Sequence, residues 1–155
     1  MSHEVTPDHI AGLVVGEGCF YAESGADRKY RSGWRIRPAF CIEMRHDDRE
    51  VLESVRQHLG CGSIYDLNFG RYQGYESKNW HPHVKYRVSN LADLHGRVLP
   101  FFREHALFGR KRTAFELFAQ LVEIKAAGRH LSDEGLAEAK ELARQLTEHN
   151  KRGSG

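Results

Sequence analysis

The sequence has few cysteines and lacks any long apolar run. Cys19, Cys41 and Cys61 are the only cysteines, and no two of them have the Cys-x-x-Cys spacing of a zinc module. An odd number of cysteines without that spacing argues against a disulfide framework and indicates a reducing compartment. No stretch has the length of a membrane-spanning helix, and no basic-then-apolar leader opens the chain. We therefore expect an intracellular, soluble protein without a membrane partner.

The chain also lacks a strong excess of charge of either sign, with a formal net charge of +2 over 155 residues. Its length suits one domain, which we place at residues 1–150, followed by a disordered tail at residues 151–155. The basic residues are unevenly spread, because six of them lie between Asp27 and Arg45 against two acidic ones. Such a patch is typical of proteins that bind a polyanion, although a solvated basic face has the same composition.

The hydrophobic periodicity predicts an α+β fold. Helices are expected at residues 7–16, 48–59, 110–127 and 132–150, with one more from residue 90 that Pro100 interrupts. Strands are expected at residues 18–26, 33–45, 63–68 and 80–89, separated by turns and by a polar loop at residues 70–78. This order predicts a four-stranded antiparallel sheet with helices packed on one face. The pair His81 and His83 fits a solvated strand face better than a metal site.

The face of the sheet that the helices leave bare is predicted to be basic. Arg35 and Arg37 alternate with apolar residues in one strand, and Lys85 and Arg87 do so in another. Arginine and lysine side chains pair with guanine edges and phosphates in the DNA major groove. A sheet face of this composition is therefore suited to lie against DNA.

Residues 10–18 read Ile-Ala-Gly-Leu-Val-Val-Gly-Glu-Gly and predict a short helix of small residues that ends at a carboxylate. Thr6 is a good N-cap for this helix, and Pro7 suits its first position. Gly12 and Gly16 are four residues apart and share one face, which allows a second backbone to approach closely. The alternative is an ordinary buried helix with a glycine C-cap and a solvated Glu17.

This run, followed directly by a strand, resembles the core motif of the LAGLIDADG homing endonucleases, with Ile10 at its first position and Glu17 at its acidic one. The resemblance implies the order αββαββα and a saddle-shaped sheet that binds double-stranded DNA. One copy of the motif implies a homodimer whose motif helices pack through Ala11, Gly12 and Val15. A symmetric dimer reads a long pseudo-palindromic target.

The resemblance also implies the chemistry of the site. Glu17, with the Gly16 carbonyl as a further ligand, is expected to bind Mg²⁺ for phosphodiester hydrolysis. Lys111, at the start of the helix after the second pair of strands, is expected to be the second catalytic residue. The resemblance places the DNA contacts on the polar strand faces and in the first hairpin turn, at Tyr21, Glu23, Arg28, Lys29, Arg35, Arg37, Tyr65, Lys85 and Arg87.

Two positions depart from the family pattern. Val15 stands where an acid is usual, and Met44 stands where a polar residue often closes the active site. Glu43 or Arg45 would then have to serve in place of Met44. These departures keep open a non-cleaving nucleic-acid binder on the same fold, such as an RNA maturase or a degenerate nuclease. A small structural or protein-interaction domain, in which the glycines serve only packing, is the remaining alternative.

Overall fold

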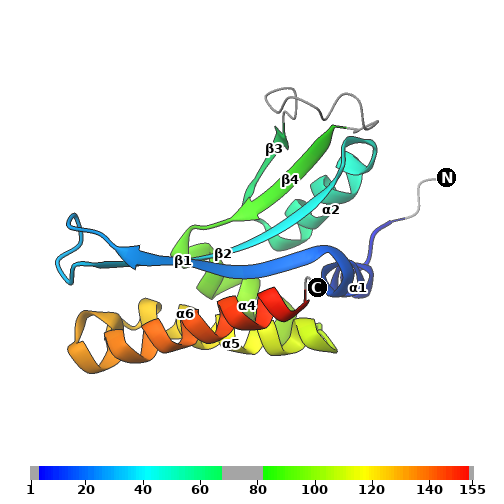
Figure 1. Ribbon diagram of the computed structural model, residues 1–155. Helices are drawn as coiled ribbons and strands as arrows, with labels where there is room; N and C mark the ends of the chain where they lie inside the picture. Colours follow the sequence, from blue (N-terminus) through cyan, green and yellow to red (C-terminus); the bar gives the residue numbers. More distant parts are fainter. Residues whose placement is uncertain (1–3, 68–81, 154–155) are drawn as a thin grey trace.

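The computed structural model describes residues 4–67 and 82–153 and confirms the α+β architecture. Figure 1 shows one sheet with α5 and α6 running along β1 and β2. The predicted loop at residues 70–78 lies outside the described residues. In chain order the elements are α1 (Pro7–Glu17), β1 (Gly18–Ala26), β2 (Trp34–Arg45), the 3-10 turn η1 (His46–Asp48), α2 (Arg49–Leu59), β3 (Ser63–Leu67), β4 (His83–Val88), α3 (Leu91–Asp93), the π-turn η4 (Leu94–Val98), α4 (Leu99–Glu104), α5 (Arg110–Ala126), the 3-10 turn η5 (Arg129–Leu131) and α6 (Asp133–Gly153).

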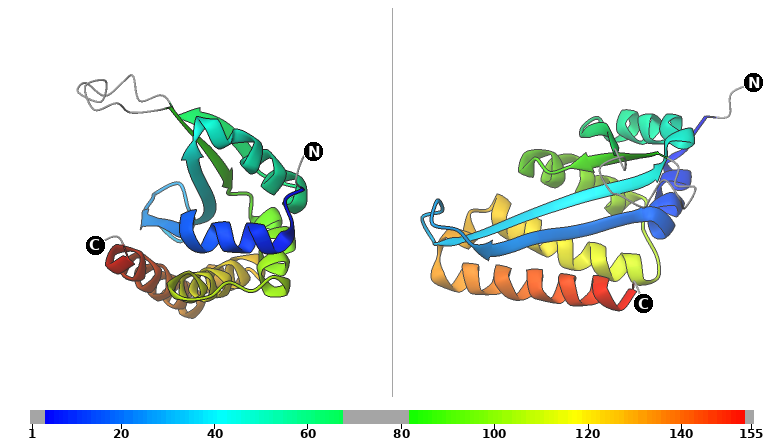
Figure 2. Two further views of the ribbon diagram at one scale, coloured as in Figure 1. Left: turned by 90° about the vertical axis from the view of Figure 1, so that its right-hand side faces the viewer. Right: turned by 45° about the horizontal axis from the view of Figure 1, so that its top comes forward.

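The four strands are antiparallel and lie in the order β1-β2-β4-β3. β1 pairs with β2 along its whole length, from Gly18 opposite Ile42 to Ala26 opposite Trp34. β4 pairs only with the last part of β2, from Phe40 onwards. The outer half of the β1–β2 hairpin therefore extends past the other two strands, as the right-hand view of Figure 2 shows.

The main core lies between the sheet and the helices. Phe20 of β1 and Phe40 of β2 are opposite each other, with stacked rings whose centroids are 4.9 Å apart. Both are fully buried, as is Tyr86 of β4, whose hydroxyl donates a hydrogen bond to the Cys61 carbonyl at 2.8 Å. Burying a side chain of this size contributes about 1.5–3 kcal/mol, so these rings hold the centre of the sheet against the helices.

A second apolar cluster supports the outer half of the hairpin. Ile36 of β2 packs there with Leu121 of α5 and Leu142 of α6. Trp34 is held on the same side, since its Nε1 donates to Ser24 Oγ at 2.9 Å. Because this cluster needs α6, the last helix is an integral part of the domain.

α1 begins and ends as its sequence predicts. The Thr6 side chain accepts a hydrogen bond from the His9 backbone N–H, and Pro7 occupies the first position. Gly18 follows the last helical residue and is already extended, so β1 starts without a connecting loop. A Cβ at Gly18 would lie 2.7 Å from Val14 Cγ1 and 2.9 Å from the Val14 carbonyl oxygen. Only glycine fits this close approach of strand to helix.

Two helix predictions differ from the structure. The helical path does not stop at Pro100, which lies within α4, but widens just before it into the π-turn η4. Proline has no backbone N–H to donate, and the wider turn before it lets the helix continue without that hydrogen bond. The predicted tail began at Lys151, whereas α6 continues to Gly153. Lysine and arginine form helices readily, and their charges favour the C-terminal end of the helix dipole.

Candidate functional site

Glu17 is the last residue of α1 and is exposed. Ile10 and Val14, about two turns and one turn earlier in α1, are fully buried and hold the helix against the core. The final carbonyls of a helix have no partner within it, which leaves the Gly16 carbonyl available beside the Glu17 carboxylate. The junction of α1 and β1 therefore presents two kinds of oxygen ligand at one point.

Lys111 reaches the same junction from the first turn of α5. Its Nζ donates a hydrogen bond to the carbonyl of Gly18, the residue directly after Glu17. Lys111, Gly16 and Cys19 also line one shared pocket. The structure thus brings Lys111, which is distant in sequence, to Gly16 and Gly18, the two residues that flank Glu17.

The open face of the sheet carries most of the predicted DNA-binding side chains. Residues that are paired across antiparallel strands point to the same face. The pairs Glu23 with Arg37 and Lys85 with Tyr65 therefore project together, away from Phe20 and its core partners. The side chains on this face are Cys19, Tyr21, Glu23, Arg35, Arg37, Ala39, Cys41, Glu43, Arg45, Ser63, Tyr65, Leu67, His83, Lys85 and Arg87.

The arginines of this open face are held by acidic and aromatic neighbours. Arg87 lies 4.0 Å from the Glu23 carboxylate, and its guanidinium carbon is 6.0 Å from the centre of the Tyr21 ring. Arg37 Nε donates to the Tyr30 hydroxyl at 3.1 Å. The Nε atoms of Arg35 and Arg87 are buried without a hydrogen-bond partner among the described residues. These arginines are pre-oriented and still have donor capacity for a ligand.

Arg28 and Lys29 lie apart from the sheet, in the turn at the tip of the β1–β2 hairpin. Both are exposed, and the Lys29 backbone N–H donates to Asp27 Oδ1 at 3.0 Å. Gly33 closes the turn with a φ of 76°, a left-handed conformation that favours glycine. The two basic side chains are thus carried at the far end of a long, supported hairpin.

Cys19 and Cys41 lie directly opposite each other on the open face, and Cys19 shares a pocket with Gly16 and Lys111. A hydrogen bond from the Cys41 thiol lowers the pKa of Cys19 to about 6, and the nearby charges of Lys111 and Lys85 add to that effect. The Cys41 thiol keeps its proton to donate this hydrogen bond and is largely buried, and both effects raise the pKa of Cys41. The two lysines therefore create a positive potential at this point, which favours a bound anion.

The described residues do not contain a complete set of protein ligands for a metal ion. No cluster of three or more His, Cys, Asp or Glu side chains with suitable spacing occurs within residues 4–67 and 82–153. Mg²⁺ often takes only one or two carboxylates and completes its shell with phosphate and water. Glu17 with the Gly16 carbonyl fits that limited donor set.

Met44 cannot supply a ligand, because it alternates onto the core side of β2 and packs against the main cluster. Glu43 lies on the open face instead and accepts a hydrogen bond from His83 Nδ1 at 3.0 Å. Arg45 is paired with Asp47 at 3.2 Å near the end of β2. His81 lies outside the described residues, so the pair that it forms with His83 in the sequence is not described.

The exposed side of α1 includes two glycines in the second half of the helix. A Cβ on Gly12 or Gly16 would meet no atom within 4 Å, and both residues are exposed. Val15 beside them is half-buried. Ala11, predicted at the same interface, is only 7% exposed because it packs in the protein's own core with Ile10 and Val14. Of the predicted interface, Gly12 and Val15 thus remain accessible, and Gly16 is exposed beside them.

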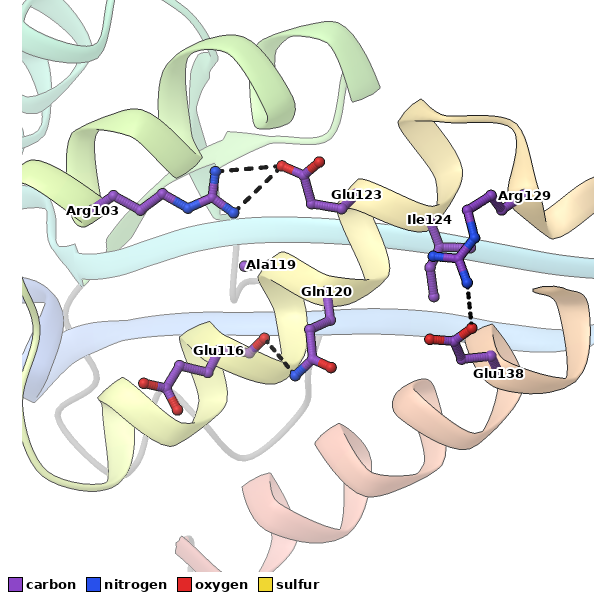
Figure 3. Close-up of a pocket in the computed structure, with 8 residues that line it drawn as sticks. All are labelled: Arg103, Glu116, Ala119, Gln120, Glu123, Ile124, Arg129 and Glu138. Carbon is purple, nitrogen blue, oxygen red and sulfur yellow. Dashed lines mark hydrogen bonds and ion pairs between the residues drawn. The ribbon is translucent and has the colours of Figure 1, made fainter.

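The helical side of the molecule offers a second hollow, drawn in Figure 3. Its charged side chains are paired with one another, since Arg103 contacts Glu123 at 3.4 Å and Arg129 contacts Glu138 at 2.6 Å. This hollow therefore lacks the uncompensated positive charge of the open sheet face.

Sequence reasoning missed the end of α6. Its His149 and Asn150 line the same pocket as Gly16 and Lys111. Neither residue has a local sequence signal, because their partners at Arg110 and Phe20 are 39 and 130 residues away.

None of the helices that the structure describes has both the length and the apolar character needed to cross a membrane.

Solved structures with the same architecture are endonucleases. I-TnaI, described as a homing endonuclease, superposes with a TM-score of 0.77 and 26% identity, over 97% of this chain and 99% of that chain. I-SmaMI bound to an uncleaved DNA target in the presence of calcium ions gives a TM-score of 0.81 over 92% of this chain and 45% of that chain. Its identity of 24% supports the fold alone.

Curated sequences lead to the same family. The Probable intron-encoded DNA endonuclease 1 of Mycosarcoma maydis is 36% identical over 104 residues, which cover 67% of this chain and 32% of that protein. The Probable intron-encoded endonuclease 2 of Neurospora crassa is 28% identical over 86% of this chain and 27% of its own length. This chain therefore spans about a third or less of each relative. A family model described as LAGLIDADG endonuclease matches residues 10–122, from α1 into α5, and the chain belongs to that family.

Proposed function

We propose that this chain is a site-specific double-strand DNA endonuclease that acts as a homodimer on a long pseudo-palindromic target. The observation that carries the proposal is the α1–β1 junction, where exposed Glu17 precedes the Gly18 carbonyl that Lys111 contacts. This junction lies at the edge of the basic sheet face. The names of the relatives from Mycosarcoma maydis and Neurospora crassa support the further proposal of an intron-encoded, intracellular protein.

The proposed metal ion is Mg²⁺, held by the Glu17 carboxylate and the Gly16 carbonyl of each subunit together with DNA phosphate oxygens. In a symmetric dimer the two Glu17 carboxylates approach each other at the ends of the paired α1 helices. Two close carboxylates repel strongly unless a cation lies between them, so the pair favours cation binding. When bound, the ion polarises the phosphodiester and promotes formation of a hydroxide nucleophile.

The residues of the chain orient the DNA and balance its charge. Lys111 Nζ has three donors, and the Gly18 carbonyl accepts one of them, which leaves donors for a phosphate oxygen. A cation at this place stabilises the negative charge that develops as the phosphodiester is cleaved. Arg37, Lys85 and Arg87 on the open face would hold the duplex against the sheet by contacts to phosphates and base edges.

The homodimer is supported by the shape of α1 and by the single copy of its motif in the sequence. The strip of Gly12, Val15 and Gly16 lets a second helix approach closely. We expect light scattering to give twice the monomer mass. A monomer at micromolar concentration would contradict the homodimer.

The nuclease proposal is tested by incubating the protein with a library of randomised pseudo-palindromic duplexes, in Mg²⁺ and separately in Ca²⁺. We expect one cleaved consensus in Mg²⁺, no cleavage in Ca²⁺, and loss of cleavage when a chelator is added. Binding enrichment in both ions without any cut product would contradict the nuclease.

That last result would support the second candidate, a non-cleaving nucleic-acid binder such as an RNA maturase or a degenerate nuclease. The observation that favours it is Met44, because this residue faces the core and cannot complete the active site. Replacing Met44 by glutamine would not repair such a site, since the new side chain would still point into the core. Binding of structured RNA in preference to the duplex library would identify the maturase.

A further inference from the structure

The last turn of α6 contacts both elements that form the proposed catalytic junction. The Asn150 side-chain amide donates a hydrogen bond to the Phe20 carbonyl in β1 at 2.9 Å. Phe20 is two residues after Gly18, whose carbonyl accepts the Lys111 bond. In Figure 1 the C-terminal end of α6 lies beside α1, at the same end of the sheet. α6 therefore contacts β1, the strand that starts directly after the candidate catalytic residue Glu17.

The same turn of α6 also holds the start of α5. Arg110 Nη2 donates to the His149 carbonyl at 2.8 Å, and His149 Nε2 lies 2.8 Å from the Arg110 carbonyl. A carbonyl only accepts, so His149 carries its proton on Nε2. α5 has no side-chain cap of its own, because Gly109 occupies the N-cap position. Among the described residues, these two hydrogen bonds thus anchor Arg110, the residue before Lys111, to α6.

We propose that Asn150 and His149 are positioning residues, which hold the start of α5 against the start of β1 and so keep Lys111 beside Glu17. The inference rests on the proposed nuclease function. It assigns a role to a segment beyond residue 122, where the family match ends. Neither residue is proposed to touch the DNA.

The apolar contacts of α6 separate this role from simple support of the fold. Ala139, Leu142, Ala143 and Leu146 are buried and hold α6 against the rest of the domain. The hydrogen bonds of α6 to β1 and to the start of α5 lie after Leu146, whereas Glu138 near its other end pairs with Arg129 of η5. Deleting one of them should leave the helix docked, while the ends of α5 and β1 gain freedom.

The test compares Asn150→Ala with Thr147→Ala, an exposed position on the same turn of α6. The readouts are the single-turnover cleavage rate at saturating protein and the Kd in Ca²⁺, both on the duplex recovered from the library. We expect Asn150→Ala to slow cleavage about tenfold, or about 1.4 kcal/mol in barrier, because misplaced catalytic groups act on the chemical step. Kd and Tm should stay near the wild-type values, Thr147→Ala should match wild type, and Asn150→Gln should recover part of the rate.

A double-mutant cycle shows whether Asn150 acts through Lys111. If it does, adding Asn150→Ala to Lys111→Met should cause little further loss of rate, because the group being positioned is already absent. Fully additive losses would overturn the proposal. So would a drop in Tm and DNA affinity that accounts for the slower rate, or a wild-type rate in Asn150→Ala.

Amide hydrogen exchange tests the contact without any cleavage. We expect faster exchange at residues 18–21 and 110–113 in Asn150→Ala, with unchanged exchange in α2. Unchanged exchange at both segments would overturn the positioning role even if the enzyme is active. If no duplex is ever cleaved by the wild type, the proposed function fails, and the exchange result alone decides whether α6 holds these two segments together.

Discussion

α1 and α2 are both 11 residues long, and each leads into a pair of strands, but they use glycine in different ways. α2 has no interior glycine and ends at Gly60, whose φ of 72° closes the helix in a left-handed conformation. α1 has Gly12 and Gly16 inside the helix, on its exposed side. An interior glycine costs a helix about 0.5–1 kcal/mol relative to alanine.

The buried sides of the two helices are alike, since both use branched aliphatic residues in the main core. The difference lies in their outer sides. The glycine of α2 serves to end its helix, whereas the glycines of α1 weaken their helix and leave open space along one side of it. This cost without a benefit to its own chain supports the proposal that a second surface packs on the strip of α1.

The largest effect is expected from the carboxylate that ends α1. Glu17→Gln keeps the size of the side chain but removes its charge, so cleavage should fall on the order of a thousandfold, as for other preorganised charge contacts. DNA binding should remain. The matched control is Glu50→Gln in the first turn of α2, which should cut normally in the same plasmid-nicking assay. Loss of DNA binding together with cleavage would remove Glu17 from its catalytic role.

Stability should depend on the buried side of α2. Leu52 is fully buried, and Leu52→Ala should lower the free energy of unfolding by about 2–5 kcal/mol through the cavity that it leaves. Urea denaturation followed by circular dichroism measures this loss. Gln57→Ala, on the exposed side of α2, should stay within about 0.5 kcal/mol of wild type. Equal losses for both variants would mean that the buried side does not carry the stability of α2.

Association should depend on the outer side of α1. Gly12→Leu fills the strip, and its Cβ would meet no atom of its own chain within 4 Å, so the protein should fold but become monomeric. Gln57→Leu adds the same side chain to the exposed side of α2 and should leave the mass unchanged. Sedimentation velocity distinguishes the two species. A dimeric Gly12→Leu protein would show that α1 is not the interface.

The smallest effects should have opposite signs at two glycines. Gly12→Ala in dilute, monomeric protein should raise the free energy of unfolding by about 0.5–1 kcal/mol, because alanine favours the helix. Gly60→Ala should lower it by at least about 1 kcal/mol, because a side chain is strained at a φ of 72°. Thermal melts at low concentration measure both changes. Destabilisation at Gly12 would show that its own chain, rather than a partner, requires the glycine.

Local sequence patterns predicted most of the elements that carry the candidate site. The alternation in β2 put Arg37 on the open face and Ile42 in the core, as the register with β1 confirms. The cap at Thr6 predicted the start of α1. The burial of Ala11 could not be predicted, because its side of the short helix is chosen by the packing of Ile10 and Val14 against the sheet.

The sequence by itself determined the elements, their order, and the residue types of the site: a small-residue helix ending in a carboxylate, and strands with alternating basic side chains. These are local properties, set by periodicity, caps and glycine. Only the tertiary structure decided which distant groups meet. It brought Lys111 to the Gly18 carbonyl and Asn150 to the Phe20 carbonyl across 93 and 130 residues. Such contacts depend on how the helices dock on the sheet, and that docking follows from the shape of the whole core.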